Sequence, residues 1–234
     1  MLNLFIKELI KKIILKEKYD SKSFVAYLRK QGMKIGDGTV VFTPAKVTID
    51  TTRPWLIEIG NDVQITQDVT ILTHGYDWTV LKGLYNEVLG SSGKVTIGNN
   101  VFIGMKTTVL KGVTIGNNVV IGANSLVNKD IPDNCVAAGN PAKVIMSIED
   151  YYEKRKNAQV KEAAELVAEY RKAYGKEPDE YALKEFFGLF SNGENLPECW
   201  DHMLSLVGNH DESLEKLKKS EHEYKDMQDF LSKV

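Results

Sequence analysis

Residues 94–127, KVTIGNNVFIGMKTTVLKGVTIGNNVVIGANSLV, carry an aliphatic side chain at every sixth position. An α-helix repeats every 3.6 residues and a strand alternates every 2, so a period of six does not describe a single amphipathic element. The in-phase positions, upstream ones included, are Ile35, Val41, Val47, Ile59, Ile65, Ile71, Ile97, Ile103, Val109, Ile115, Ile121 and Val127. Periodicity of this kind predicts a solenoid rather than an ordinary sandwich.

Each six-residue unit is long enough for a short strand and a corner, so three units form one triangular coil. Stacked coils pair as parallel strands about 4.8 Å apart and enclose a continuous aliphatic column. A glycine follows many of the aliphatic positions, at Gly36, Gly60, Gly98, Gly104, Gly116 and Gly122. We expect these glycines to supply the backbone freedom, including positive φ, that the corners need.

The repeat is interrupted between Ile71 and Ile97, which are not separated by a multiple of six residues. The interruption is THGYDWTVLKGLYNEVLGSSGK, residues 73–94, and a loop of that length in a compact domain is usually functional or disordered. It carries His74, Tyr76, Asp77, Trp78 and Tyr85. Groups of this kind bind polar ligands that have an apolar body, so the loop is the candidate functional segment.

Composition narrows the class of protein. The chain has 234 residues, 43% of them hydrophobic and 26% charged, with a net charge of −2, which indicates a globular protein without general affinity for nucleic acid. The two cysteines, Cys135 and Cys199, have neither zinc-ligand spacing nor the pattern of a disulfide framework, and we expect a reducing, cytoplasmic location.

The first residues, MLNLFIKELIKKIILKEK, predict an amphipathic helix within an N-terminal helical segment, residues 1–30. Its broad apolar face comprises Leu2, Phe5, Ile6, Leu9, Ile10 and Ile13. The interspersed lysines and glutamate rule out a bilayer-spanning segment. We expect the apolar face to pack on the protein itself; peripheral contact with the inner face of the membrane is the alternative.

Three segments together resemble the left-handed β-helix acyltransferases of the hexapeptide-repeat group: IEIGNDVQITQDVTILTH (57–74), VTIGNNVFIGMKTTVLKGVTIGNNVVIGANSLVNKDIP (95–132) and AAGNPAKVI (137–145). The resemblance implies a mainly β fold, with residues 31–147 forming a left-handed parallel β-helix interrupted by loop 73–94. It also implies a homotrimer that uses acetyl-CoA as acyl donor and no metal. The donor groove would then lie between adjacent subunits.

The resemblance implies that His74 is the general base and that the backbone N–H of Met105 binds the oxyanion. Imidazole is suited to this role because it exchanges a proton near neutral pH, and no covalent enzyme intermediate is required. A carboxylate or carbonyl should orient the ring, and Asp77, Glu58 and Asp68 are the candidates. The loop residues Asp77, Trp78 and Tyr85 are the expected acceptor-binding residues.

The resemblance also places the pantetheine arm of the coenzyme along Phe102, Gly104, Met105, Gly122 and Ala123, where amides of the ligand would pair with exposed backbone. Asn128, Lys129 and Lys143 would contact its phosphate and adenine end. Phe102 and Thr66 stand where many sugar-acetylating members have tryptophan and asparagine.

We therefore expect an O-acetyltransferase that acts on a sugar hydroxyl in surface-polysaccharide synthesis, because TTRPWLIEIG and THGYDW are most similar to the polysaccharide-associated members. The alternatives are acetylation of a small acceptor (a free sugar, an amino acid, an antibiotic or an amino-sugar nucleotide) and a non-catalytic scaffold. The related zinc-dependent carbonic anhydrases use three histidines, whereas His74 is the only histidine before His202.

From Ile148 onward the composition predicts a helical C-terminal extension, residues 148–234. We expect a helix that ends at Gly175, a second from Pro178 to Phe187 or Phe190, and further helices over 198–208 and 211–234. Leu217, Tyr224 and Leu231 lie seven residues apart in the last of these. The extension would cap the last coil, shape the acceptor pocket or bind a partner. His202, His210 and His222 are interpreted as surface or packing residues.

Overall fold

The structure is a computed structural model that describes residues 12–234. Most of the predicted N-terminal apolar face, Leu2 to Ile10, lies outside the described residues, and Ile13 is exposed. The chain divides into two compact units, one ending at Tyr151 and one comprising Tyr152–Val234. No helix among the described residues is both long enough and apolar enough to cross a bilayer.

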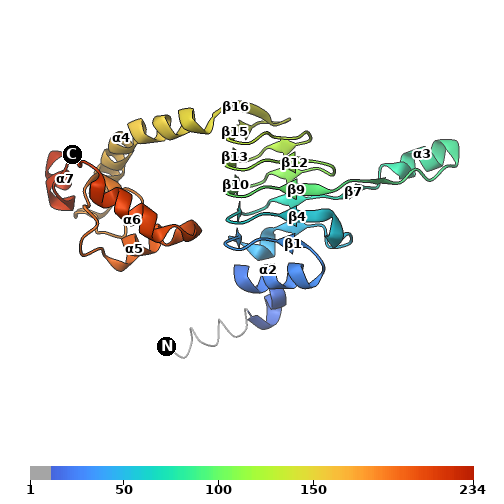
Figure 1. The fold of residues 1–234 in the computed structure, drawn as a ribbon, viewed down its shortest axis with the longest axis horizontal. Helices are drawn as coiled ribbons and strands as arrows, with labels where there is room; N and C mark the ends of the chain where they lie inside the picture. Colours follow the sequence, from blue (N-terminus) through green and yellow to red (C-terminus); the bar gives the residue numbers. More distant parts are fainter. Residues whose placement is uncertain (1–11) are drawn as a thin grey trace. The chain divides into compact units, whose positions relative to one another are not determined.

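Most strands of the first unit are short and belong to three sheets, A, B and C (Figure 1). Sheet A comprises β1 (Lys34–Ile35), β4 (Ile57–Ile59), β9 (Val95–Ile97) and β12 (Thr114–Ile115). Sheet B comprises β2 (Val40–Val41), β5 (Gln64–Ile65), β10 (Val101–Ile103), β13 (Val119–Ile121), β15 (Cys135–Ala138) and β16 (Lys143–Ser147). Sheet C comprises β3 (Thr48–Ile49), β6 (Thr70–Ile71), β11 (Thr108–Val109) and β14 (Leu126–Val127). Successive strands enter sheets A, B and C in turn, so the chain winds as a three-sided coil.

The predicted aliphatic column is confirmed. Strands of neighbouring coils pair in parallel, with Ile97 beside Ile115, and Ile103 beside Ile121. Ile103, Ile115 and Ile121 are fully buried. Because one inward position of each strand lies above its equivalent in the coil below, the period of six becomes a stack of side chains in each sheet.

The predicted register is wrong in the first coil. Ile49, not Val47, pairs with Ile71 in sheet C. The reason is a 3-10 turn, η2 (Pro44–Lys46), which adds two residues before β3 begins. Val47 and Ile49 are both buried, so the hydrophobic pattern alone does not reveal the shift. Because of these two extra residues, β3 and the residues that follow it pair with the next coil two positions later than the period of six predicts.

The corner glycines have a different role from the one expected. Gly104 has no positive φ; a Cβ there would lie 2.5 Å from the backbone nitrogen of Ala123 in the next coil. The left-handed conformation occurs instead two residues later, at Lys106 (φ 60°) and Asn124 (φ 59°). The glycines therefore permit the close approach of stacked corners, and polar residues adopt the positive φ that the turn requires.

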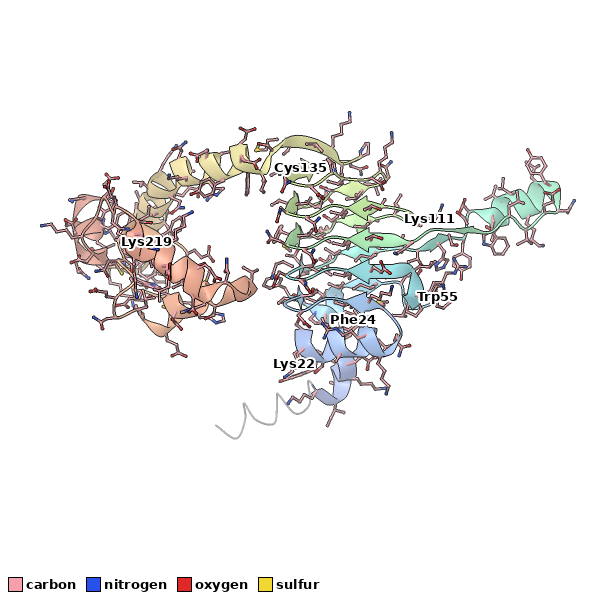
Figure 2. The ribbon with its side chains drawn as sticks, viewed as in Figure 1. Lys22, Phe24, Trp55, Lys111, Cys135 and Lys219 are labelled. Atoms are coloured by element: carbon pink, nitrogen blue, oxygen red, sulfur yellow. The ribbon has the colours of Figure 1, made fainter. Side chains whose placement is uncertain are left out.

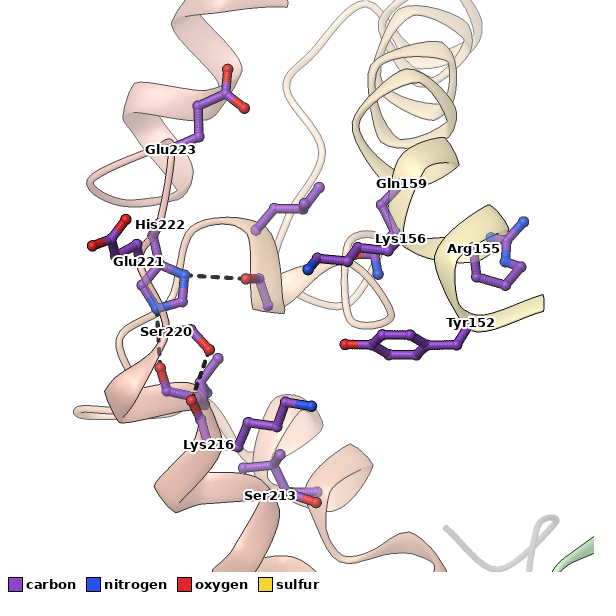
Figure 3. A pocket seen from close by; sticks show the side chains of 14 residues that line it. Tyr152, Arg155, Lys156, Gln159, Ser213, Lys216, Ser220, Glu221, His222 and Glu223 are labelled. Carbon is purple, nitrogen blue, oxygen red and sulfur yellow. Dashed lines mark hydrogen bonds between the residues drawn. The ribbon is translucent and has the colours of Figure 1, made fainter. Parts of the chain in front are cut away.

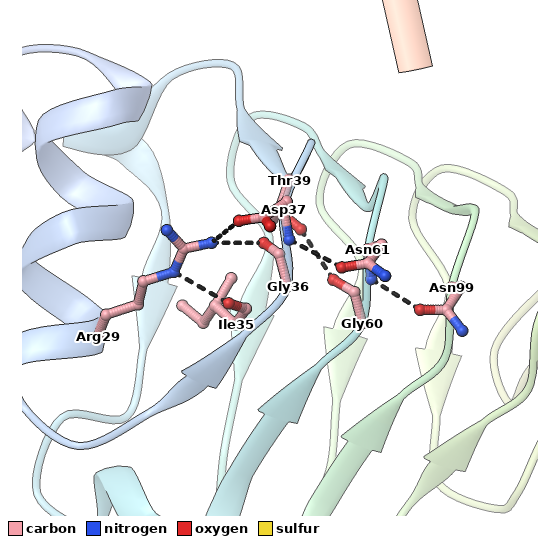
Figure 4. Close-up of polar contacts among 8 residues, drawn as sticks. All are labelled: Arg29, Ile35, Gly36, Asp37, Thr39, Gly60, Asn61 and Asn99. Carbon is pink, nitrogen blue, oxygen red and sulfur yellow. Dashed lines mark hydrogen bonds and ion pairs between the residues drawn. The ribbon is translucent and has the colours of Figure 1, made fainter. Parts of the chain in front are cut away.

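Side chains connect the coils at the corner between sheets A and B (Figure 4). The Oδ1 of Asn61 accepts a bond of 2.8 Å from the Asp37 amide, and the Oδ1 of Asn99 accepts one of 2.8 Å from the Asn61 amide. Arg29 terminates the stack by donating to the carbonyl oxygens of Ile35 and Gly36. These bonds satisfy backbone groups that lie outside the strand pairs.

Both ends of the stack are covered. Helix α2 (Ser21–Lys30) follows a short turn, η1 (Lys16–Lys18), and packs buried Phe24 and Leu28 beneath the first coil. At the other end β16 folds back antiparallel on β15, near Cys135 (Figure 2). Covering or pairing terminal strands prevents edge-to-edge association with other chains.

The interruption of the repeat is an ordered arm rather than an irregular loop. Strands β7 (His74–Gly75) and β8 (Ser91–Ser92) form an antiparallel ribbon that carries helix α3 (Trp78–Tyr85) away from the coils (Figure 1). No residue of α3 is buried. The 3-10 turn η3 (Pro54–Leu56) precedes β4 in the coil below.

The second unit is helical. Helix α4 (Ile148–Tyr174) ends as predicted, next to Gly175. It is followed by η4 (Phe187–Leu189), α5 (Glu198–Leu204), η5 (Leu206–Gly208), α6 (His210–Lys219) and α7 (Met227–Lys233). The predicted helix from Pro178 is wrong, because that segment forms turns before η4, and the predicted final helix is broken between α6 and α7. Leu217, Tyr224 and Leu231 nevertheless share one core, with Trp200 and Phe230.

Candidate active site

His74 begins the arm at the corner that follows sheet C. Its Nδ1 lies 2.6 Å from Oδ2 of Asp50, the residue that follows β3 in the coil below. The histidine side chain is 13% exposed and the aspartate side chain 4% exposed. Within residues 12–234 the Nε2 of His74 has no hydrogen-bond partner. One ring nitrogen is therefore held by a buried carboxylate, and the other is available to a ligand.

The Asp50 carboxylate is bound from several sides. The Thr73 hydroxyl donates to its Oδ2, and the Thr52 hydroxyl and amide donate to its Oδ1 at 2.6 and 3.0 Å. Burial raises the pKa of the Asp50 carboxyl, but hydrogen bonds from Thr52, Thr73 and His74 outweigh that effect and hold the pKa well below its usual range. An ionised Asp50 accepts the Nδ1–H of His74, so Nε2 carries the lone pair.

None of the three carboxylates proposed from the sequence orients the ring. Glu58 binds Lys34 at 2.7 Å and Lys94 at 2.5 Å, and these bonds lower its pKa to about 2. Asp68 accepts a bond from its neighbour Gln67, and Asp77 lies beside Gly75. Asp50 was not among the sequence-based candidates. The two residues added at η2 shift β3, and the spacing of six does not predict that Asp50 then lies beside His74 of the next coil.

Aromatic side chains of the arm extend from the histidine. The Tyr76 ring meets the His74 ring edge-on, with ring centroids 5.1 Å apart. The ring centroids of Trp78 and Tyr76 are 6.3 Å apart. Trp78 is thus connected to His74 through Tyr76, which the sequence analysis did not select as a site residue. Asp77 is exposed and makes no capping bond, and Tyr85 lies at the far end of α3, 64% exposed. The structure does not bring Tyr85 to the histidine within one chain.

The expected donor-groove residues lie mainly at the corner between sheets B and C. Gly104 is stacked against Gly122 and Ala123 of the next coil, and this close approach requires small residues. In the described part of the chain the amides of Met105 and Ala123 donate no hydrogen bond, and both residues are exposed. Two free N–H groups on adjacent coils can bind carbonyl or oxyanion oxygens of a ligand lying along this corner.

The other expected coenzyme residues are dispersed. Phe102 projects from β10 with 41% of its surface exposed, and exposed Lys143 begins β16. Asn128 and Lys129 follow β14, so they share the corner of His74, two coils away. The histidine and the Met105 amide therefore occupy different corners of one prism, separated by the width of sheet C.

Among residues 12–234 no three His, Cys, Asp or Glu side chains gather as a set of metal ligands. Cys135 and Cys199 are both free thiols, and burial raises the pKa of Cys135.

Comparison with known proteins identifies similar chains. The family described as bacterial transferase hexapeptide (six repeats) matches residues 94–129. Protein CapG of Staphylococcus aureus is 46% identical over 124 residues, covering 53% of this chain and 71% of that protein. The putative acetyltransferase YvoF of Bacillus subtilis (strain 168) is 37% identical over 126 residues, covering 54% and 67% respectively. A crystal structure of a hexapeptide-repeat acetyltransferase from Vibrio cholerae aligns with a TM-score of 0.46 at 21% identity, covering 61% of this chain and 89% of that one.

Proposed function

The chain belongs to the bacterial hexapeptide-repeat transferases and is an acetyltransferase, and from this premise we propose that it moves the acetyl group of acetyl-CoA directly to a sugar hydroxyl. The observation that carries the proposal is the buried Asp50–His74 pair, which leaves Nε2 unpartnered at the base of the arm. A ring oriented in this way can act as a general base, which supports the proposal.

The reaction proceeds through one tetrahedral intermediate. Nε2 of His74 takes the proton of the acceptor hydroxyl as its oxygen attacks the thioester carbonyl, and Asp50 stabilises the imidazolium. The Met105 amide donates to the oxyanion. When the intermediate collapses, the carbon–sulfur bond breaks and the thiolate takes the proton from the imidazolium. The products are an acetyl ester and coenzyme A with a free thiol.

We propose further that the coil is left-handed and that three copies associate, so that His74 of one copy faces Met105 of its neighbour. The placement of these two residues at different corners supports a shared site. Two groups of exposed apolar side chains also support it: Val80, Leu84 and Tyr85 on the arm, and Phe42, Phe102, Met105, Val144 and Ile145 along sheet B and its corner. Joining such surfaces removes apolar area from water.

The proposed acceptor is a surface polysaccharide. The name of one relative supports a sugar hydroxyl: the galactoside O-acetyltransferase of Escherichia coli (strain K12) is 45% identical over 96 residues. The projecting arm, with Tyr76 beside the histidine and Trp78 beside Tyr76, supports a ligand longer than one sugar. Domain limits at residues 31 and 147, a cytoplasmic location and the roles of Asn128, Lys129 and Lys143 remain predictions.

The test follows thiol release from acetyl-CoA with a panel of neutral and acidic glycans. We expect turnover by the wild type and its loss in His74→Ala. His202→Ala, which changes an exposed histidine in the second unit, is the matched control and should keep full activity. Equal rates for His74→Ala and wild type, with the same oligomeric state, would refute the assignment of the base.

A further inference from the structure

The second unit contains a cavity of about 700 Å³ between α4, α6 and the segment that follows α6 (Figure 3). Its lining includes the apolar side chains of Leu189, Leu204 and Leu217, which we call the leucine floor. Its walls are polar, with Tyr152, Lys156 and Gln159 from α4, and Ser213 and Lys216 from α6. A volume of this size suits a ligand of one or two sugar rings, because typical ligand pockets measure about 300–1,000 Å³.

Two ammonium groups face this space. Figure 3 shows Lys156, Lys216 and the Tyr152 hydroxyl directed toward one another. The Lys216 Nζ lies 5.5 Å from the centre of the Tyr152 ring. Across residues 12–234 neither lysine takes part in an ion pair, and the Tyr152 hydroxyl makes no hydrogen bond. All three side chains are exposed, so the opening presents three donors that have no hydrogen-bond or ion-pair partner among the described residues.

The neighbouring charged groups do not neutralise these lysines. Glu162 is held by the guanidinium of Arg155, with an Nη1–Oε1 distance of 2.8 Å. Glu221 and Glu223 belong to the rim and are directed away from the lysines in Figure 3. Neither lysine is in an ion pair, although the C-terminal extension, residues 148–234, has more acidic than basic residues. Both lysines are exposed, so water screens their repulsion, and a bound anion would accept charge-assisted hydrogen bonds from both.

The rest of the lining adds neutral hydrogen-bonding groups. The side chains of Gln159 and Ser213 have no partner within the described chain. Both ring nitrogens of His222 lie against carbonyl oxygens, of Gly188 at 3.2 Å and Leu217 at 3.1 Å, so this ring offers no acceptor to the cavity. Amide, hydroxyl and ammonium donors beside an apolar floor match a hydroxylated ring that bears an anion.

We propose that this cavity binds an acidic saccharide, with a carboxylate between Lys156 and Lys216 and the sugar ring over the leucine floor. The inference rests on the proposed function, since it makes the tail a second binding site for an acidic glycan acceptor. The carboxylate would accept from both ammonium groups and from the Tyr152 hydroxyl. The second unit would thus bind an acidic glycan through residues that take no part in the chemistry at His74.

The test is calorimetric titration of the full chain with digalacturonate in the absence of acetyl-CoA. We expect saturable binding that weakens as salt is added, because the contact is charge-assisted. Lys156→Gln/Lys216→Gln should weaken binding by about 10- to 100-fold, and Tyr152→Phe by a smaller factor. Lys154→Gln/Lys161→Gln, which removes the same charge from positions of α4 that do not line the cavity, should bind like the wild type.

Two further ligands separate the possible sources of the signal. The dimethyl ester of digalacturonate keeps both rings without charge and should bind at least about 10-fold more weakly. Inorganic phosphate should compete only at much higher concentration. Equal affinity for phosphate, no binding of digalacturonate, or equal binding by the Lys156/Lys216 variant with unchanged circular dichroism would each overturn the proposal. Because no acetyl donor is present, these outcomes are independent of whether His74 catalyses transfer.

Discussion

Replacement of Asp50 by asparagine tests the geometry of the proposed base directly. The carboxylate accepts from His74 and Thr73 through Oδ2 and from Thr52 through Oδ1. An asparagine of the same size places an NH₂ group at one of these positions. If that group donates to Nδ1 of His74, the ring proton moves to Nε2 and the lone pair faces away from the acceptor hydroxyl.

The expected loss follows from the role of the ring. A general base contributes about 10²- to 10⁴-fold in rate, so Asp50→Asn should lower kcat by that factor, equivalent to about 3–5 kcal/mol of barrier. The KM for acetyl-CoA should stay close to that of the wild type, because Asp50 does not touch the Met105 corner. The variant should also lose about 1–3 kcal/mol of stability through the altered buried bonds.

The assay measures thiol release at saturating acetyl-CoA, with thermal unfolding and sedimentation to verify the fold. Asp37→Asn is the matched control, since its side chain is 99% exposed and pairs only with Arg29 at 3.1 Å among the ion pairs of the described residues. Asp50 would be a positioning residue acting through His74. A kcat within threefold of wild type for Asp50→Asn would refute this reasoning, because the wrong tautomer cannot serve as a base.

Other consequences are open to measurement. The low pKa of the Asp50 carboxyl means that its contribution to stability is present above the unfolded value near 3.9 and is lost as pH falls through the lower folded value. The stability difference between wild type and Asp50→Asn in denaturant titrations should therefore shrink below about pH 4. Gly98→Ala should cost about 1–3 kcal/mol, because its Cβ would lie 2.7 Å from the Gly116 carbonyl oxygen; a neutral result would contradict the close-approach explanation. Ile103→Ala should cost about 2–5 kcal/mol in the same titration, since the side chain is fully buried. Leu84→Asp should leave the unfolding of the monomer unchanged but weaken self-association in sedimentation, because Leu84 is 68% exposed in one chain; unchanged association would exclude the arm from the interface.

Sequence periodicity predicted the solenoid because each coil repeats the same local requirement. Each strand of every coil must bury one aliphatic side chain. The spacing of Ile97, Ile103 and Val109 therefore predicts the inner column from the sequence alone. The bounds of α4 followed for a similar reason, since a glycine marks its end locally. His74 could be selected because it begins the segment that breaks the repeat and because the resemblance to the hexapeptide-repeat acyltransferases implies a general base there.

Contacts between residues of neighbouring coils could not be predicted from the sequence alone. Asp50 and His74 meet because η2 inserts two residues and shifts β3, and both Val47 and Ile49 satisfy the hydrophobic pattern. The role of the corner glycines, the helix on the arm and the cavity at Lys156 depended likewise on contacts between distant segments. Hydrophobic spacing specifies which side chains face inward, whereas the register of one coil on the next, fixed by turn geometry and packing, decides which polar groups become neighbours.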